Sequence, residues 1–309
     1  MKTAFLFPGQ GAQYPGMARD LFDASATVRD LFALAADSTG IDVQRLLFEG
    51  SEEELKETVN TQVSVTLANL ASAAVLAERG ILAEGAAGFS LGEYAALVEA
   101  GVLTAAQIFP LVKLRGEFMA KAAAALDRTT GDPGMAAVLG LSPEKVDEAL
   151  ASASIADLYG ANYNSPNQVV ISGTAAGLAA GIEALKAAGA RRVVVLKVSG
   201  PFHSPLLSDA GRSLEEALKV IEFKNPTKAL FSNVTGGLVT TGADAKALAV
   251  RQVTAPVRWT TEEKALLDAG FNRFVEVGPG AVLAGLWGAF HDTLPCHAAG
   301  KLEQIQQIG

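Results

Sequence analysis

The chain of 309 residues is half apolar and 19% charged, with a mean hydropathy of +0.27. This composition excludes a disordered chain, and the length fits one large domain or two linked ones. A net charge of −8 argues against nucleic-acid binding, which needs a basic face, and the one cysteine, Cys296, can form neither an internal disulfide nor a thiolate metal cluster.

The sequence contains no run of 18 or more apolar residues. The apolar stretch near the N-terminus covers only residues 4–7, which is too short for a signal peptide. We therefore expect a cytoplasmic, monomeric, globular protein without a membrane, nucleic-acid or metal partner.

The first part of the chain alternates between short apolar strands and longer helices. Residues 4–7 form an apolar run before a Pro-Gly turn, which is typical of a buried strand. Apolar positions spaced by three and four residues predict a helix over 61–79. A strand over 86–89 and a helix over 91–98 are separated by one residue, and a further helix is predicted over 104–126.

The middle of the chain follows a different order after a Gly/Pro-containing linker. We predict strands and helices in the order β-α-β-β-α-β, which is the signature of a ferredoxin-like unit. The predicted elements are a strand at 135–139, a helix from 142, strands at 157–163 and 168–172, a helix at 174–189 and a strand at 192–196.

After this unit the chain returns to alternating strands and helices, with strands at 229–231 and 274–277. Such alternation predicts a mostly parallel sheet that is covered on both faces. We therefore expect an α/β fold in which residues 1–130 and 199–309 form an α/β-hydrolase-like core. Residues 131–198 are expected to form an inserted ferredoxin-like subdomain.

A five-residue motif, Gly88-Phe89-Ser90-Leu91-Gly92, lies at the predicted strand-to-helix turn. In a G-x-S-x-G turn the serine takes a strained backbone conformation with its hydroxyl exposed, and the glycines let neighbouring backbone approach closely. The N–H of the residue after the serine faces the position where a negative oxygen would form. The motif predicts a nucleophile, and the alternative is a plain turn with a capping serine.

A serine nucleophile needs a base, and the chain has only three histidines. His203 lies in a Gly/Pro-rich segment directly after a strand, where sites on parallel sheets gather. His291 and His297 follow the last predicted strand, where a solvated surface position is expected. His203 is therefore favoured as the partner of Ser90. No acid between these two residues stands in a context that marks it as a third member of a triad.

Seven segments resemble the malonyl-CoA:acyl carrier protein transacylase family, which includes the acyltransferase domains of polyketide synthases. They occur in the family's order and span almost the whole chain, and the family also carries an inserted ferredoxin-like unit. The segments are FPGQGAQ (7–13), SLGEY (90–94), LRG (114–116), NYNSPNQVV (162–170), GPFHS (200–204), QVTAPVRW (252–259) and EVGPG (276–280).

The resemblance implies a role for each matching position. Ser90 would take the acyl group, and His203 would be its general base and then its general acid. The N–H groups of Gln10 and Leu91 would form the oxyanion hole. In this family a backbone carbonyl orients the histidine, here that of Gln252, which would account for the lack of an acid.

Substrate recognition follows from the same resemblance. Arg115 matches the arginine that pairs with the malonyl carboxylate, although an arginine on a helix is more often an ordinary surface residue. The family has histidine where this chain has Phe89, and we expect catalysis to survive this change. Phe202 resembles the bulky residue of malonyl-selective domains, and Asn162 begins a matching segment expected at the substrate site.

The expected reaction is ping-pong transfer of malonyl from malonyl-CoA to the phosphopantetheine thiol of an acyl carrier protein, with no cofactor. Carrier proteins are typically acidic and so is this chain, so attraction must come from a local basic patch. Lys186, Arg191 and Arg192 are candidates for that patch, and scattered solvated charges are the alternative.

Three other functions remain open at this point. A thioesterase or esterase would use the same serine and pass the acyl group to water. Within the family, the chain could serve a polyketide assembly line or a malonate decarboxylase. A non-catalytic module that binds CoA or a carrier protein would keep the fold without the chemistry.

Overall fold

The computed structural model describes residues 1–308. Its strands are β1 (Thr3–Phe7), β2 (Gly85–Gly88), β3 (Gly134–Leu139), β4 (Leu158–Ser165), β5 (Gln168–Gly173), β6 (Arg192–Val195), β7 (Ala229–Phe231), β8 (Leu238–Val239), β9 (Arg273–Glu276) and β10 (Cys296–Ala298). Its helices are α1 (Arg19–Ala24), α2 (Ala26–Thr39), α3 (Val43–Glu49), α4 (Glu52–Lys56), α5 (Thr58–Glu78), α6 (Gly92–Glu99), α7 (Ala105–Ala124), α8 (Pro143–Ala153), α9 (Ala175–Ala187), the 3-10 turn η1 (Pro205–Leu207), α10 (Ser208–Leu218), α11 (Gly242–Arg251), α12 (Trp259–Asp268), α13 (Val282–Gly288) and α14 (Leu302–Gln307).

The larger sheet has six strands in the order β10-β9-β1-β2-β7-β8. All neighbouring pairs are parallel except β7 and β8, so the prediction of a mostly parallel sheet is confirmed. Strand β10 was not predicted, because three partly exposed residues at a sheet edge carry no apolar pattern. His297, expected in a tail beyond the last strand, lies on this strand and is exposed.

Strand β1 shows why both faces of this sheet are buried. Phe5 and Phe7 belong to the core that contains the buried residues of α5, α6 and α7. Ala4 and Leu6 point to the other face and belong to the core that contains residues of α12 and α13. An unbroken apolar run is therefore required here, which is the pattern expected of a strand covered by helices on two sides.

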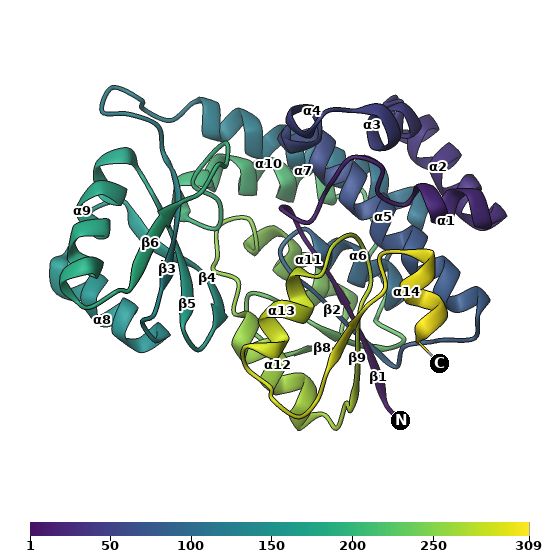
Figure 1. Cartoon of the computed structure of the whole chain (residues 1–309). Coiled ribbons are helices and arrows are strands. Elements are labelled where there is room, and N and C mark those ends of the chain that lie inside the picture. The colour runs from purple at the N-terminus through teal and green to yellow at the C-terminus, as the bar shows by residue number, and fades with distance from the viewer. Residues whose placement is uncertain (309) are drawn as a thin grey trace.

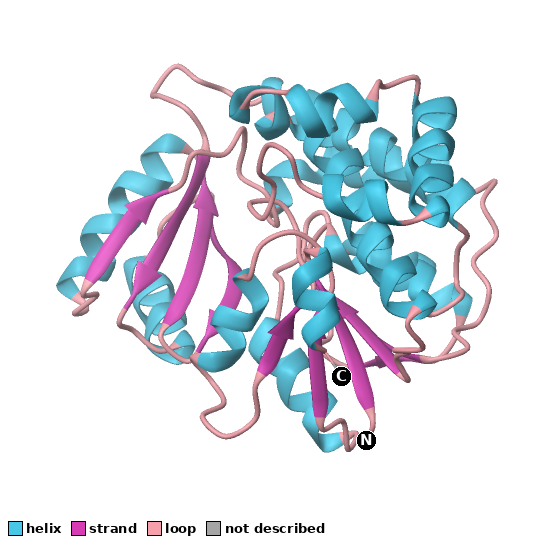
Figure 2. Cartoon of the chain, turned by 45° about the vertical axis from the view of Figure 1, so that its right-hand side comes forward, coloured by secondary structure: helices cyan, strands magenta, loops and turns pink. Residues whose placement is uncertain are grey.

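The second sheet is antiparallel throughout, in the order β4-β5-β3-β6. Figures 1 and 2 show it standing apart from the larger sheet, with α8 and α9 on its outer side. Val169 and Ile171 pack into the core under these helices, whereas Met135 and Val170 face the larger part of the molecule. The ferredoxin-like assignment and the boundaries 131–198 stay predictions.

Strand β4 is tied to the larger part of the chain by main-chain hydrogen bonds. The Tyr163 N–H donates to the Val257 carbonyl at 2.8 Å, and the Val257 N–H donates to the Ala161 carbonyl at 2.8 Å. Asn162 lies between these two bonds and forms a parallel bridge with Val257. The inner edge of the small sheet is thereby held against the larger part at one defined point.

Two long helices form the centre of the larger part. Helix α7 begins with a capping box of Thr104 and Gln107 and continues through Pro110 without a break. Helix α5 is long and apolar enough to cross a membrane by length and composition, but 78% of its most apolar stretch is buried inside the structure. This burial is that of a core helix, and α5 packs along α7.

Candidate active site

Ser90 occupies the turn between β2 and α6, so the predicted strand–turn–helix context is present. Its φ of 50° lies in the left-handed region, which strains a residue that has a Cβ. A Cβ at Gly88 would lie 2.1 Å from the carbonyl carbon of Gly92, and one at Gly92 would lie 1.9 Å from the Phe7 carbonyl oxygen. Only glycine fits at either position, which explains the spacing of the motif.

His203 faces the serine across a gap of 2.7 Å between its Nε2 and the Ser90 Oγ. Its Nδ1 lies 2.9 Å from the Gln252 carbonyl oxygen and 3.2 Å from that of Ala255. Since a carbonyl can only accept, Nδ1 carries the proton and Nε2 is left to accept from the serine hydroxyl. Burial, reinforced by the positive charge of Arg115, lowers the pKa of His203 to about 4. The imidazole is therefore neutral at pH 7.

Two main-chain N–H groups beside the serine have no acceptor within residues 1–308, namely those of Gln10 and Leu91. The loop that carries Gln10 lies directly against the turn. A Cβ at Gly9 would lie 2.3 Å from the Phe89 carbonyl oxygen and 3.4 Å from the Leu91 nitrogen. Two donors from segments far apart in the sequence are thus brought to one place.

Arg115 is buried, with 1% of its surface exposed. The alternative interpretation of Arg115 as an ordinary surface arginine is therefore wrong. Its Nη1 donates to Gln62 Oε1 at 2.6 Å and its Nη2 to Gln252 Oε1 at 2.9 Å. Its guanidinium also lies 5.0 Å from the centre of the Tyr94 ring. Gly116 permits this placement, because a Cβ there would lie 2.9 Å from the Gln62 side chain. Both oxygen partners are neutral amides, so within residues 1–308 the positive charge has no carboxylate partner.

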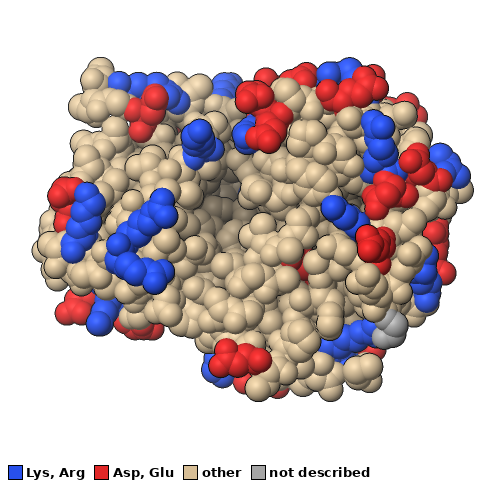
Figure 3. All heavy atoms as spheres, viewed as in Figure 1, with Lys and Arg blue, Asp and Glu red and all other residues tan. Residues whose placement is uncertain are grey.

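Ser90, His203 and Arg115 line one cavity of about 230 Å³. Figure 3 shows the surface hollowed between the part that carries the small sheet and the rest of the molecule. Of the other predicted site residues, Leu91 and Gln252 are buried behind the wall, and the rest form part of it. The wall includes Gln10, Gln62, Phe89, Met119, Met135, Asn162, Phe202, Val282 and Leu286.

The chain matches proteins of known type along its whole length. The acyl transferase domain family matches residues 4–306. A malonyl CoA-acyl carrier protein transacylase of Bacillus subtilis is 39% identical, over 99% of this chain and 95% of the relative. One of Staphylococcus aureus is 38% identical, over 99% of this chain and 97% of the relative.

The chain belongs to the malonyl CoA-acyl carrier protein transacylase family.

Solved structures of this family have the same fold. A malonyl transacylase in complex with a type II PKS acyl carrier protein superposes with a TM-score of 0.94 at 36% identity, covering 99% of this chain and 98% of that one. The transacylase of Clostridium perfringens superposes with a TM-score of 0.93 at 34% identity, covering 99% and 96%. The α/β architecture expected from the sequence is therefore confirmed.

Several residues of the transacylase site were missed by sequence reasoning. Gln62 holds Arg115, and the Ala255 carbonyl is a second acceptor near His203. Asn233 accepts from the Ser90 N–H. It follows β7, the neighbour of β2, and carboxyl ends of parallel strands meet at one edge, so its position in the chain was a usable signal.

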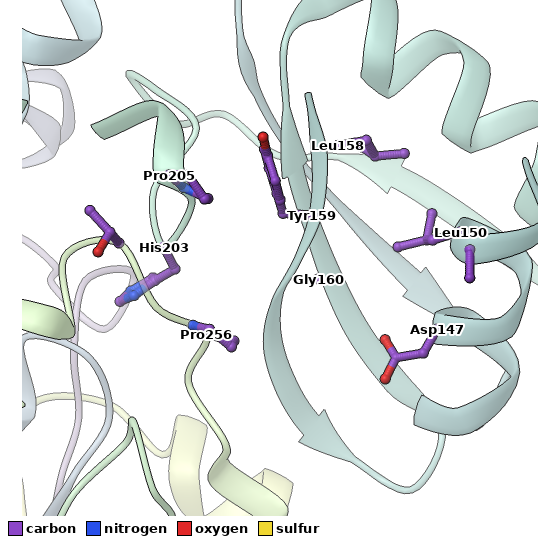
Figure 4. Close-up of a pocket in the computed structure, with 10 residues that line it drawn as sticks. Asp147, Leu150, Leu158, Tyr159, Gly160, His203, Pro205 and Pro256 are labelled. Atoms are coloured by element: carbon purple, nitrogen blue, oxygen red, sulfur yellow. The ribbon is translucent and has the colours of Figure 1, made fainter. Parts of the chain in front are cut away.

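A second groove, of about 420 Å³, reaches the same histidine but not the serine. Figure 4 shows His203, Pro205 and Pro256 on one side of it and Tyr159 of β4 on the other. The imidazole is therefore part of the wall of both cavities. No three His, Cys, Asp or Glu side chains in the described part of the chain are grouped so as to hold a metal ion.

His291 is not the solvated surface residue that was expected. Its ring centre lies 4.2 Å from that of Trp287, and its side chain is only 13% exposed. Its Nε2 lies 3.8 Å from an Oε2 of the buried Glu263. Neither His291 nor His297 lines the cavity that contains Ser90.

Proposed function

We propose that this transacylase transfers a malonyl group from malonyl-CoA to the phosphopantetheine thiol of an acyl carrier protein through a malonyl ester on Ser90. The observation that carries the proposal is the 2.7 Å contact between Ser90 Oγ and His203 Nε2 in a cavity that Arg115 also lines. The names of the relatives, which are malonyl CoA-acyl carrier protein transacylases, support the same substrates.

In the first half-reaction, His203 Nε2 takes the hydroxyl proton while Ser90 Oγ bonds to the thioester carbonyl carbon. The carbonyl oxygen becomes negative and accepts hydrogen bonds from the N–H groups of Gln10 and Leu91. The C–S bond then breaks, and the CoA sulfur leaves with the proton from His203. The products are the malonyl-serine ester and free CoA thiol.

In the second half-reaction the same groups work in reverse. The phosphopantetheine thiol gives its proton to His203, and its sulfur bonds to the ester carbonyl carbon. The C–O bond breaks and Ser90 Oγ recovers the proton. Because the ester and the two thioesters are of comparable energy, the reaction runs in both directions.

The carbonyls of Gln252 and Ala255 take the place of the triad carboxylate. Both accept at Nδ1 of His203, so they hold the tautomer in which Nε2 is the base. A neutral acceptor stabilises the imidazolium less than a carboxylate would. The low pKa of His203 is consistent with this arrangement, because the histidine is charged only while the proton is in transit.

Arg115 is proposed as the group that recognises the malonyl carboxylate. A guanidinium has five N–H groups, and two of those of Arg115 are held by Gln62 and Gln252, which leaves donors for a bidentate pair. An acyl group without a carboxylate would leave the buried charge unpaired. Selection for malonyl therefore comes both from attraction and from the penalty on other acyl groups.

Three further wall residues are proposed to shape the acyl site. Phe89 packs edge-on against Trp259 with ring centres 5.5 Å apart, and it supplies apolar surface where the family has histidine. Phe202 is buried beside His203 and would crowd a methyl on the malonyl α-carbon, which discriminates by about 1–3 kcal/mol. Asn162, held by the β4 bridge, lines the same cavity.

The carrier protein is proposed to dock beside the small sheet. Arg191 and Arg192 are exposed, and within residues 1–308 neither forms an ion pair. Lys186 is a weaker candidate than expected, because its Nζ is paired with Glu183 at 2.8 Å. Basic side chains gather on this part of the surface in Figure 3.

The proposal also includes the oligomeric state, the cellular location and the domain boundaries of the protein. We infer a monomer, because Ser90, His203 and Arg115 of a single chain already meet in one cavity, so the proposed chemistry needs no residue from a second copy. We infer a cytoplasmic location from the lone cysteine, which forms no disulfide. We also infer that residues 131–198 are an inserted ferredoxin-like subdomain and that 1–130 and 199–309 are the catalytic core. Light scattering, cell fractionation and limited proteolysis test these in turn.

The decisive experiment is intact-protein mass spectrometry after incubation with malonyl-, methylmalonyl- or acetyl-CoA. Malonyl-CoA should add one malonyl group, and Ser90→Ala should abolish this adduct; a surviving adduct would mean another nucleophile. Adding carrier protein should move the group to its phosphopantetheine. Release of free malonate at the same rate as transfer would instead indicate a thioesterase, and a wild type that never acylates would indicate a binding module.

A further inference from the structure

Asn233 is a fully buried residue whose side chain spans the turn that carries the nucleophile. Its Oδ1 accepts from the Ser90 N–H at 2.6 Å, and its Nδ2 donates to the Gly88 carbonyl at 2.7 Å. The second hydrogen of Nδ2 goes to Glu262 Oε2 at 2.8 Å. Every hydrogen-bonding atom of the carboxamide is therefore used, and its orientation is defined.

A second amide holds the other side of the serine. Gln252 Nε2 donates to the Ser90 carbonyl at 2.9 Å. In a trans peptide the C=O and the following N–H point in opposite directions, so this bond turns the Leu91 N–H away from Gln252. Asn233 fixes the peptide before Ser90 and Gln252 fixes the one after it.

The two amides rest on a common buried carboxyl group. Glu93 Oε2 accepts from the Asn233 main-chain N–H at 3.0 Å and from Gln252 Nε2 at 2.9 Å. Burial raises the pKa of Glu93 to about 7 and that of Glu262 well above its usual range. The raised pKa favours the neutral form of Glu262, whose Oε2 accepts from the Asn233 carboxamide.

This support matters because the turn is strained. A serine at φ 50° persists only where its surroundings over-determine the conformation. Both Ser90 Oγ and the Leu91 N–H are carried by the peptides that the amides hold. A shift of about 1 Å in such a group costs on the order of 100-fold in rate.

We propose that Asn233 is a positioning residue of the transfer reaction, whose carboxamide holds the strained turn so that Ser90 Oγ faces His203 and the Leu91 N–H faces the reacting carbonyl. It touches neither substrate nor reacting atoms. The inference rests on the proposed function, since it concerns the geometry of the same serine.

The test compares two substitutions that keep the branching of the side chain at Cγ. Asn233→Leu accepts no hydrogen bond, whereas Asn233→Asp keeps an oxygen that can accept from the Ser90 N–H. Asn225→Leu is the matched control, because Asn225 also accepts a main-chain N–H, from Gly242 at 2.9 Å, in a different part of the fold. For each variant we would measure Tm, the rate of malonyl-enzyme formation, and kcat and KM for transfer.

Asn233→Leu should lower kcat about 100-fold in both half-reactions, with KM for malonyl-CoA within about twofold. Asn233→Asp should recover at least about tenfold of that loss, and Asn225→Leu should change Tm only. A role in packing alone would leave Leu as active as Asp. The proposal is overturned if folded Asn233→Leu keeps kcat within about threefold of wild type, or if Leu and Asp are equally impaired.

If Asn233→Leu does not fold, Asn233→Ala takes its place in the same comparison with Asn233→Asp. The same measurements distinguish a failure of the proposed function from a failure of the positioning role of Asn233. A wild type that forms no malonyl adduct contradicts the proposed function. A wild type that forms the adduct beside an equally fast Asn233→Leu or Asn233→Ala contradicts only the positioning role.

Discussion

Replacing Arg115 by alanine should remove most of the preference for malonyl over acetyl groups. Arg115 is 1% exposed, and its guanidinium donates to the amide oxygens of Gln62 and Gln252 and has no carboxylate partner within residues 1–308. Removing one member of a buried charge pair costs about 2–5 kcal/mol. This corresponds to about 30- to 5,000-fold in kcat/KM for malonyl-CoA.

Acetyl-CoA should respond in the opposite sense or not at all. In the wild type an acetyl group leaves the Arg115 charge desolvated and unpaired, and in Arg115→Ala that penalty is gone. The ratio of kcat/KM for malonyl-CoA to that for acetyl-CoA should therefore fall by about 30-fold or more. The assay is the rate of acyl-enzyme formation at low substrate, followed by quenching and intact mass.

Two controls separate recognition from damage to the fold. Arg115→Lys keeps the charge but cannot present two parallel donors, so its ratio should lie between those of wild type and Arg115→Ala. Arg45→Ala removes an exposed arginine that is paired with Glu54, and it should leave the ratio unchanged. An Arg115→Ala enzyme that is folded and discriminates as well as wild type would refute the carboxylate pairing.

Three other predictions concern the residue before Ser90, the pH dependence of the reaction and the binding of the carrier protein. Phe89→His should keep kcat within roughly tenfold, about 1.4 kcal/mol, because this side chain shapes the cavity and moves no proton; a larger change would show that it takes part in the chemistry. The pKa of His203 is lowered to about 4, so the base is lost only as the pH falls through that value. The titration of His203 should therefore leave kcat/KM unchanged between about pH 8 and about pH 5, and a midpoint near 6.5 that belongs to His203 would contradict its lowered pKa. Replacing Arg191 and Arg192 by glutamate should raise KM for the carrier protein about tenfold and leave malonylation by malonyl-CoA unchanged, whereas equal effects on both half-reactions would rule out the basic patch.

Much of the fold was readable because its signals are local. The apolar run of β1, the capping box of α7 and the turn between β2 and α6 each depend on residues within a few positions of one another. Helices α1–α4 and the edge strand β10 were missed. Helices α1, α3 and α4 and strand β10 have at most seven residues each, which is too few for a clear periodic pattern. Helix α2 has 14 residues between Ser25 and Gly40, so its capping signals were local and could have been found.

The site divides in the same way. The motif around Ser90 can be recognised in the sequence, because only glycine fits at positions 88 and 92, where a Cβ would lie about 2 Å from backbone atoms. His203 stood out because it is one of three histidines and follows a strand. Arg115 could be assigned only through resemblance, since its burial depends on α5 passing close to α7 at Gly116.

The amino-acid sequence by itself determined the mostly parallel sheet, the turn that carries Ser90 and the choice of His203 as its partner, since backbone sterics and residue scarcity can be read without coordinates. Only the tertiary structure decided what holds these groups in place. Asn233 and Gln252 lie 143 and 162 residues from the serine they hold. An amide side chain has no sequence signature for its partner, because a hydrogen bond is specified by distance and direction in space and not by spacing along the chain.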